Sequence, residues 1–185
     1  MKRQFLRRLV AAIGGLTMAA MLPVSSMASA AEDPTIRFVA NKSTVQAGDM
    51  VMLSVNVDHV PAAGWNVMEF SISYDNQQLE PVMFQEHGKD YEWMPGPAMD
   101  LMDQMTIVNL SVNPILAASI SANGQCENGE YLYIQFKVND HVNKGDKLTL
   151  TVDLKQFAQS IIVDGTPHTV DLVQPGTSTI TLTVL

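Results

Sequence analysis

The chain has 185 residues, a formal net charge of −8 and a single cysteine, Cys126. An excess of acidic residues repels phosphate backbones and anionic membranes, so the composition argues against nucleic-acid binding. One cysteine excludes a disulfide within the chain. Cys126 lies among turn-forming residues at 123–129, and we expect a loop thiol there.

Residues 1–30 have the features of a secretory signal peptide. Four basic residues precede an apolar run at 9–24, and Ala28-Ser29-Ala30 is a small-residue cleavage site. The run is too short and too interrupted to predict a membrane span. We expect cleavage after Ala30 and export of the rest. Removing four of the 11 Lys and Arg leaves seven against 19 Asp and Glu, a net charge of −12. Residues 31–185 suit one domain.

Alternating apolar and polar residues predict strands at 35–40, 50–57 and 65–74. In the second of these, the inward residues are Val51, Leu53, Val55 and Val57. In the third, Met68, Phe70, Ile72 and Tyr74 are expected to face inward, and the outward residues are Val67, Glu69, Ser71 and Ser73.

The middle of the chain breaks this pattern after a short predicted strand at 79–85. Pro95-Gly96-Pro97 is incompatible with a continuous helix or ladder, so we expect a long ordered loop over 86–102 and one or two helical turns within 98–105. Five methionines fall between positions 83 and 105, with Tyr91 and Trp93 among them. Such a segment either packs a small core of its own or presents an adaptable apolar surface to a partner.

Short strands are predicted again towards the C-terminus, at 106–112, 115–121, 131–138, 147–154, 160–163, 168–173 and 178–185. In the strand at 131–138, Leu132, Ile134, Phe136 and Val138 are expected to face the core. Tyr131, Tyr133, Gln135 and Lys137 are then expected to face outward. Nine or ten short strands separated by turns predict an all-β fold, a two-sheet antiparallel sandwich.

The sequence offers no pattern typical of an enzyme, a metal site or a cofactor site. Its four histidines are scattered through turns without metal-ligand spacing, and it has no calcium-binding loop motif. Acidic residues gather loosely at Glu86, Asp90, Glu92, Asp100 and Asp103, but their spacing does not establish the paired carboxylates of a glycosidase. We therefore predict a protein without catalytic activity, metal or cofactor.

An ordered set of short motifs resembles the cohesin domain, the receptor module of bacterial cellulosomes. The set comprises Gly48-Asp49, Val60-Pro61, Gly64, Phe70, Ser73-Tyr74-Asp75, Leu79-Glu80 and the strand at 129–138. The resemblance implies a nine-stranded jelly-roll sandwich. It also implies a secreted, non-catalytic module that captures dockerin-bearing proteins for assembly of a polysaccharide-degrading complex.

The resemblance further implies a dockerin-binding sheet made of the strands at 65–74, 106–112 and 131–138. The candidate contacts on it are Val67, Glu69, Ser71, Ser73, Asn109, Ser111, Asn113, Tyr131 and Tyr133. Cohesins carry Asn and Asp at the positions matching Val67 and Glu69, so this chain is expected to differ in dockerin specificity.

Two other functions remain open at the level of sequence. Carbohydrate-binding modules of families 2 and 3 share the sandwich superfamily, and fold alone does not separate them from cohesins. In that reading, Trp65, Tyr131 and Tyr133 form an aromatic platform for a plant polysaccharide. A surface or pilus-like structural subunit is the third class, favoured only by the apolar strand at the end of the sequence.

Overall fold

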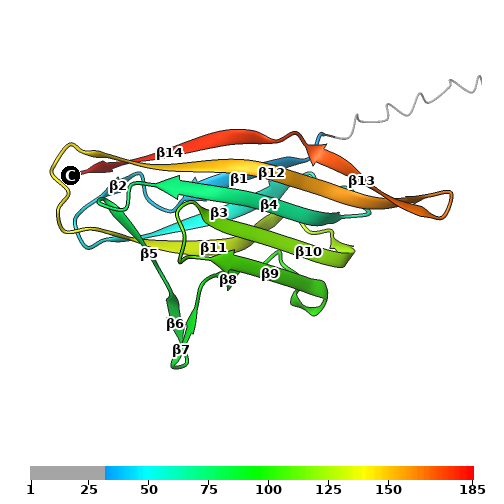
Figure 1. Cartoon of the computed structure of the whole chain (residues 1–185), viewed down its shortest axis with the longest axis horizontal. Helices are drawn as coiled ribbons and strands as arrows, with labels where there is room; N and C mark the ends of the chain where they lie inside the picture. The colour runs from blue at the N-terminus through cyan, green and yellow to red at the C-terminus, as the bar shows by residue number, and fades with distance from the viewer. Residues whose placement is uncertain (1–31) are drawn as a thin grey trace, which may run out of the picture. The chain divides into compact units, whose positions relative to one another are not determined.

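The computed structural model describes residues 32–185, which form a sandwich of two β-sheets (Figure 1). The signal peptide predicted at 1–30 lies outside the described residues. The first sheet has the order β1-β3-β11-β5, and a short strand, β8, also pairs with β11. Its strands are β1 (Thr35–Ala40), β3 (Met50–Asp58), β5 (Leu79–Val82), β8 (Met94–Pro95) and β11 (Gly129–Val138). The two-sheet sandwich expected from the strand pattern is confirmed.

The second sheet has the order β2-β14-β12-β4-β10-β9, and β13 pairs with β12. Its strands are β2 (Thr44–Val45), β4 (Trp65–Tyr74), β9 (Gln104–Asn109), β10 (Ile115–Gln125), β12 (Lys147–Val163), β13 (Thr166–Val173) and β14 (Gly176–Val184). All pairs in the two sheets are antiparallel except β2 with β14. Because β4 lies between β12 and β10, its outward residues occupy the middle of this sheet.

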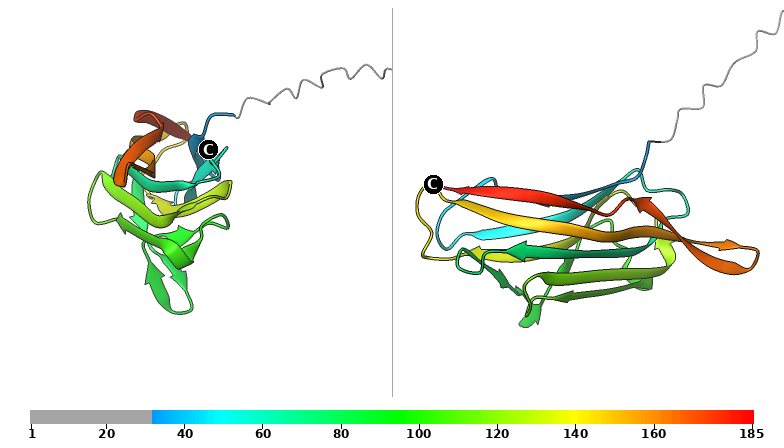
Figure 2. Two further views of the ribbon diagram at one scale, coloured as in Figure 1. Left: turned by 90° about the vertical axis from the view of Figure 1, so that its right-hand side faces the viewer. Right: turned by 45° about the horizontal axis from the view of Figure 1, so that its top comes forward.

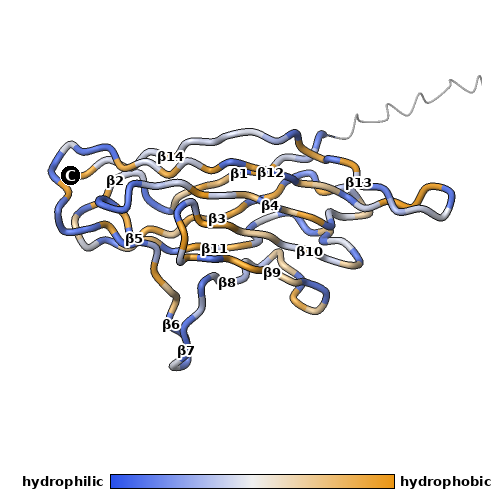
Figure 3. Tube along the Cα trace, viewed as in Figure 1, coloured by the Kyte–Doolittle hydropathy of each residue, from blue (hydrophilic) through white to orange (hydrophobic). Residues whose placement is uncertain are grey.

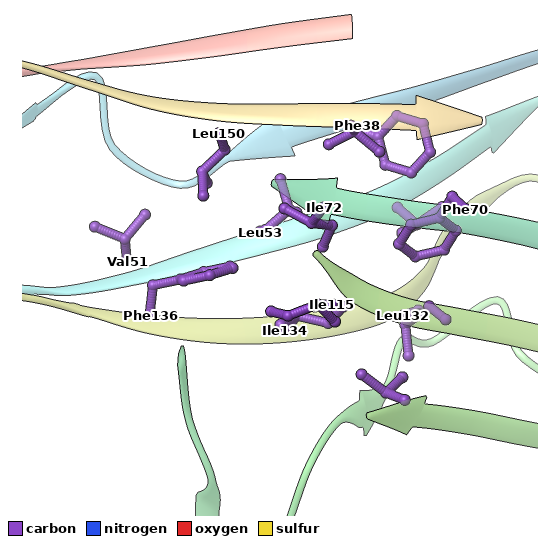
Figure 4. Packing of buried hydrophobic residues seen from close by; sticks show 14 of the residues in the cluster. Phe38, Val51, Leu53, Phe70, Ile72, Ile115, Leu132, Ile134, Phe136 and Leu150 are labelled. Carbon is purple, nitrogen blue, oxygen red and sulfur yellow. The ribbon is translucent and has the colours of Figure 1, made fainter. Parts of the chain in front are cut away.

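The core lies between the sheets and contains the inward residues predicted for β3, β4 and β11 (Figure 4). Phe70, Ile72, Ile134 and Phe136 are buried, as the alternation predicted. Aromatic pairs join the two layers: the ring centroids of Phe38 and Phe70 lie 5.1 Å apart. This interdigitation is the expected way for two half-apolar sheets to remove their inner faces from water.

Tyr131 departs from the predicted orientation, because it is fully buried. The pairing of β11 with β3 shifts register between Glu130 and Leu132, so an extra residue enters the strand at Tyr131. Such a β-bulge places two consecutive residues on the same side. The Tyr131 ring packs edge-on against buried Trp65, with centroids 5.2 Å apart, and its hydroxyl donates to the Glu127 carbonyl.

The two strands predicted at 147–154 and 160–163 are one continuous strand, β12. It pairs with β14 along its first half and with β13 along its second half. The β12–β13 hairpin turns at Asp164-Gly165, and β13 begins at Thr166, two residues before the predicted strand. Both turn residues have positive φ, 51° and 78°, which suits a two-residue turn between twisted strands.

The Met-rich middle segment contains more regular structure than the predicted loop. It holds a hairpin of β6 (Phe84–Glu86) and β7 (Lys89–Tyr91), then β8 and a single 3-10 turn, η1 (Leu101–Asp103). The hairpin projects from the sandwich (Figures 1 and 2). Met99 is buried and Met94 half-buried, whereas Met83, Met102 and Met105 are exposed. The segment thus contributes Met99 to the core of the sandwich and presents other methionines to solvent.

Candidate functional site

The candidate residues of β4 and β9 share the outer face of the second sheet. Glu69 and Ser73 are exposed, Val67 is half-buried, and Ser71 is largely covered by its neighbours. Across β10, Leu116 pairs with both Ser71 of β4 and Asn109 of β9. The structure therefore brings these five candidates onto one continuous surface.

Ser111 and Asn113 lie in the turn between β9 and β10, because β9 ends at Asn109 rather than at the predicted residue 112. The Asn109 side-chain oxygen accepts a hydrogen bond from the Ser111 backbone N–H at 3.0 Å. The Asn113 side chain donates to the Tyr74 carbonyl at 2.8 Å. Both amide side chains thus fix the turn at one end of the candidate face.

Tyr131 and Tyr133 do not belong to this face, so the expected sheet of three strands is wrong. Their strand, β11, lies in the first sheet between β3 and β5, on the opposite side of the sandwich from β4 and β9. The chain crosses between the sheets within residues 126–128, directly after β10. Tyr133 does face outward and is half-buried. Its hydroxyl donates to Glu130 Oε2 at 2.7 Å, and desolvation, reinforced by that carboxylate, raises its pKa to about 12.

The aromatic platform considered for a carbohydrate-binding module is absent from the described chain. Trp65 and Tyr131 are fully buried against each other in the core, where neither ring can stack on a sugar. Only Tyr133 of the three reaches the surface. The sequence pattern correctly placed Trp65 at the start of its strand, but it did not predict that the side chain is buried.

The candidates chosen from the sequence missed the apolar part of the face. Met105 and Ile107 on β9 and Leu116 and Ile120 on β10 are each more than half exposed. Met105 pairs with Ile120, and Ile107 pairs with Ala118, so these side chains form one patch. Figure 3 colours part of β9 as hydrophobic. Alternation within the predicted strand at 106–112 places Ile107 on the same outward side as Asn109. The same alternation, applied to the next strand, would have found Leu116 and Ile120.

Polar and apolar halves of this face meet in a shallow depression of about 440 Å³. Glu69, Ser71 and Lys155 line its polar side, and Ile107 and Leu116 line its apolar side. Lys155 lies at an irregularity in the pairing of β12 with β4 and forms an ion pair with Asp153. An apolar centre bordered by polar groups is typical of a protein–protein interface.

The described part of the chain shows no constellation for catalysis or metal binding around this face. Across residues 32–185, no group of three or more His, Cys, Asp or Glu is placed to hold a metal ion. The same residues contain no helix long and apolar enough to span a membrane.

Comparison with known proteins gives the family. The model of the cohesin domain matches residues 36–173, most of the chain. This protein belongs to the cohesin family. Cohesins are non-catalytic binding modules. No curated protein matches the chain.

Solved cohesins share the fold at low sequence identity. The seventh ScaB type I cohesin from Pseudobacteroides cellulosolvens is 19% identical, with a TM-score of 0.54, covering 81% of this chain and 92% of its own. A non-cellulosomal cohesin from the archaeon Archaeoglobus fulgidus is 17% identical, with a TM-score of 0.54, covering 83% and 92%. The OlpA cohesin from Clostridium thermocellum, solved as a type I cohesin–dockerin complex, is 16% identical, with a TM-score of 0.53, covering 82% and 99%.

Proposed function

We propose that this cohesin is exported and binds a dockerin-bearing protein, so that it takes part in assembling a polysaccharide-degrading complex. The supporting observation is the outer face of the second sheet, where four exposed apolar side chains border a polar strip. Apolar side chains gathered on one face of a soluble protein mark an interaction surface. Structurally similar cohesins have been solved with dockerins bound.

The proposed contact residues form two groups: apolar residues that contribute affinity and polar residues that contribute specificity. The apolar group loses most of its contact with water when a partner covers it; its members are Met105, Ile107, Leu116 and Ile120. Glu69 stands beside them, flanked in register by Ala118 of β10 and Gln156 of β12. Its carboxylate accepts hydrogen bonds from donors on the partner, and such bonds give specificity more than affinity. Val67, Ser71, Ser73 and Asn109 complete the face. Tyr131 is excluded by its burial.

Export rests on residues 1–30, whose basic start, apolar run and small-residue site are typical of a signal peptide. A secreted location fits the assembly of a complex that acts on insoluble polysaccharide outside the cell.

Calorimetric titration with a panel of dockerin domains tests the function. We expect at least one dockerin to bind. Leu116→Asp should weaken that complex at least a hundredfold, because it places an unpaired charge in the apolar part of the interface. Glu69→Ala should cost about 1–3 kcal/mol of binding free energy while leaving the melting temperature nearly unchanged.

Two controls lie outside the proposed face. Ile162→Asp changes an equally exposed aliphatic residue near the tip of the β12–β13 hairpin, and Tyr133→Phe changes the opposite sheet. Both variants should bind dockerin like the wild type. Titration with soluble and insoluble polysaccharides runs in parallel. Binding of polysaccharide with no dockerin bound would replace the proposal with a carbohydrate-binding function.

A further inference from the structure

A second cleft, separate from the proposed dockerin face, opens between the β6–β7 hairpin, β8 and η1. Its volume is about 500 Å³. Three carboxylates, two aromatic rings and an aliphatic side chain dominate its lining: Glu86, Asp90, Glu92, Tyr91, Trp93 and Leu101. None of these residues lies on the outer face of β4, β9, β10 and β12.

Backbone pairing and hydrogen bonds hold each of the three walls of this cleft. Met94 and Pro95 pair with β11, and the Gly96 backbone N–H donates to the Tyr131 carbonyl at 2.8 Å. The Asp100 backbone N–H donates to the side-chain oxygen of buried Gln125 at 2.7 Å, which fixes the start of η1. The hairpin supplies the opposite wall through its own ladder. Long-range contacts therefore hold the walls formed by β8 and η1, and the local ladder of the hairpin forms the remaining wall.

The charged groups of the cleft are almost all hydrogen-bond acceptors. Glu86, Asp90 and Glu92 bring three carboxylates, and among the residues that the structure describes no Lys or Arg lines the cleft. Within residues 32–185, the basic side chain in contact with these carboxylates is that of His87, whose Nδ1 lies 3.8 Å from Glu86 Oε1. Sugar hydroxyls can also donate to these carboxylates, but a sugar carries no positive charge to offset three neighbouring anions. A guanidinium or ammonium group only donates and also carries the complementary charge.

The aromatic and aliphatic walls suit the rest of such a ligand. A cation near an aromatic face is attracted by the ring quadrupole, and the methylene stem of Lys or Arg packs along apolar surface. Tyr91, Trp93 and Leu101 supply both kinds of surface. We propose that this cleft binds a Lys or Arg side chain of a partner protein.

The residues at the rim of the cleft favour a basic side chain of a protein over a small cationic molecule as the ligand. Leu101 lines the cleft and is more than half exposed, and the next residue, Met102, is 95% exposed. Both are held in place by hydrogen bonds rather than by apolar packing, since Asp103 accepts from the Ser121 hydroxyl and the Asn123 N–H. Leu101 and Met102 thus form an exposed apolar surface beside the charged cleft. A partner protein would bury this surface when its basic side chain enters the cleft.

NMR titration of the ¹⁵N-labelled protein with short peptides tests the proposal without any dockerin. The probes are acetyl-Gly-Arg-Gly-amide and acetyl-Gly-Lys-Gly-amide, with acetyl-Gly-Gln-Gly-amide as the uncharged control. We expect saturable shifts at the Trp93 indole N–H and at the amides of residues 86–92 with the basic peptides only. The affinity should fall as salt is added.

A matched pair of variants separates a built site from general attraction to an acidic protein. Asp90→Asn/Glu92→Gln removes two cleft carboxylates and should weaken peptide binding at least fivefold. Asp140→Asn/Asp171→Asn removes two exposed carboxylates elsewhere and should leave it unchanged. An unchanged amide spectrum outside the cleft confirms that each variant folds.

Three results would overturn the proposal. One is the absence of saturable shifts with the basic peptides. The second is an equal loss of affinity in both double variants, which indicates nonspecific attraction. The third is a response of the same residues to cellopentaose but not to the peptides, which identifies a sugar site. None of these outcomes depends on whether the protein binds dockerin, so the two proposals fail separately.

Discussion

Phe136 shows how much of this fold depends on single buried side chains. It is fully buried, and its ring meets that of Tyr74 across the sandwich with centroids 5.6 Å apart. Truncating such a residue removes its transfer free energy and leaves a cavity that the surrounding strands only partly fill.

Phe136→Ala should therefore lower the free energy of unfolding by about 3–5 kcal/mol, measured by urea denaturation. Ile162→Ala is the control, because Ile162 is largely exposed and should change stability by no more than about 0.5 kcal/mol. A loss below about 1 kcal/mol for Phe136→Ala would contradict the burial of this side of β11.

Tyr131 is expected to make the free energy of unfolding depend on pH in the alkaline range. Burial raises the pKa of its hydroxyl to about 12, with a smaller opposing effect from the neighbouring Trp65. The folded protein then keeps this proton at pH values where the unfolded chain, with a pKa near 10, has lost it. The resulting stability is complete below about pH 10 and is lost as the pH rises towards 12.

Urea denaturation at a series of pH values from 9 to 12 measures this effect. The free energy of unfolding should fall with pH in the wild type, and Tyr131→Phe should reduce the slope, because one of the raised pKa values is removed. Tyr133 contributes to the remaining slope, since its pKa is also raised to about 12. An identical slope in wild type and Tyr131→Phe would contradict the burial of this hydroxyl.

At the scale of elements, β8 is the link between the Met-rich segment and the sandwich. Gly96 follows β8 and lies directly against the backbone of β11. A Cβ atom at this position would stand only 2.1 Å from the Glu130 carbonyl oxygen. Glycine is needed here for close approach of two backbones, since its φ is not in the left-handed region.

Gly96→Ala should thus push β8 away from β11 and destabilise the protein by about 1–3 kcal/mol through overpacking. Amide shifts should concentrate in residues 92–101 and in the start of β11. Gly176→Ala is the matched control, because its added Cβ meets nothing closer than 4.0 Å and its φ is ordinary. Equal stability of the two variants would show that the approach of β8 to β11 is not tight.

At the scale of the whole molecule, the two sheets carry different surfaces. The outer face of the second sheet collects the exposed apolar side chains of β9 and β10, and the first sheet presents Tyr133 bonded to Glu130. The Met-rich segment adds a cleft that neither sheet provides. One sandwich therefore offers two separate places for a partner.

The proposed export concerns the whole chain and has its own test. The protein purified from culture medium should begin at Ala31, which intact-mass and N-terminal peptide analysis would show. The predicted signal peptide is the sequence of residues 1–30. Retention of Met1 to Ala30 in the exported protein would contradict cleavage at the predicted site.

The candidate site was only partly predictable from the sequence. Glu69, Ser73 and Asn109 were placed correctly on an outward face, because alternation within a strand reports the side to which each residue points. Tyr131 was placed wrongly, because a bulge shifts the phase by one residue and leaves no local signal in a run such as Tyr131-Leu132-Tyr133. The apolar residues of β10 were missed because the resemblance assigned the binding face to the strands at 65–74, 106–112 and 131–138, which do not include the strand at 115–121.

The sequence by itself determined most of the long strands and the inward faces of β3 and β4, because those features depend on neighbours a few residues apart. Only the tertiary structure decided which strands share a sheet. Strand pairing joins residues that are distant in the chain, as Glu69 and Gln156 are in β4 and β12. For that reason β11, which directly follows β10 in the chain, lies in the other sheet, and the surface available to a partner is set by β9 and β10 rather than by the tyrosines.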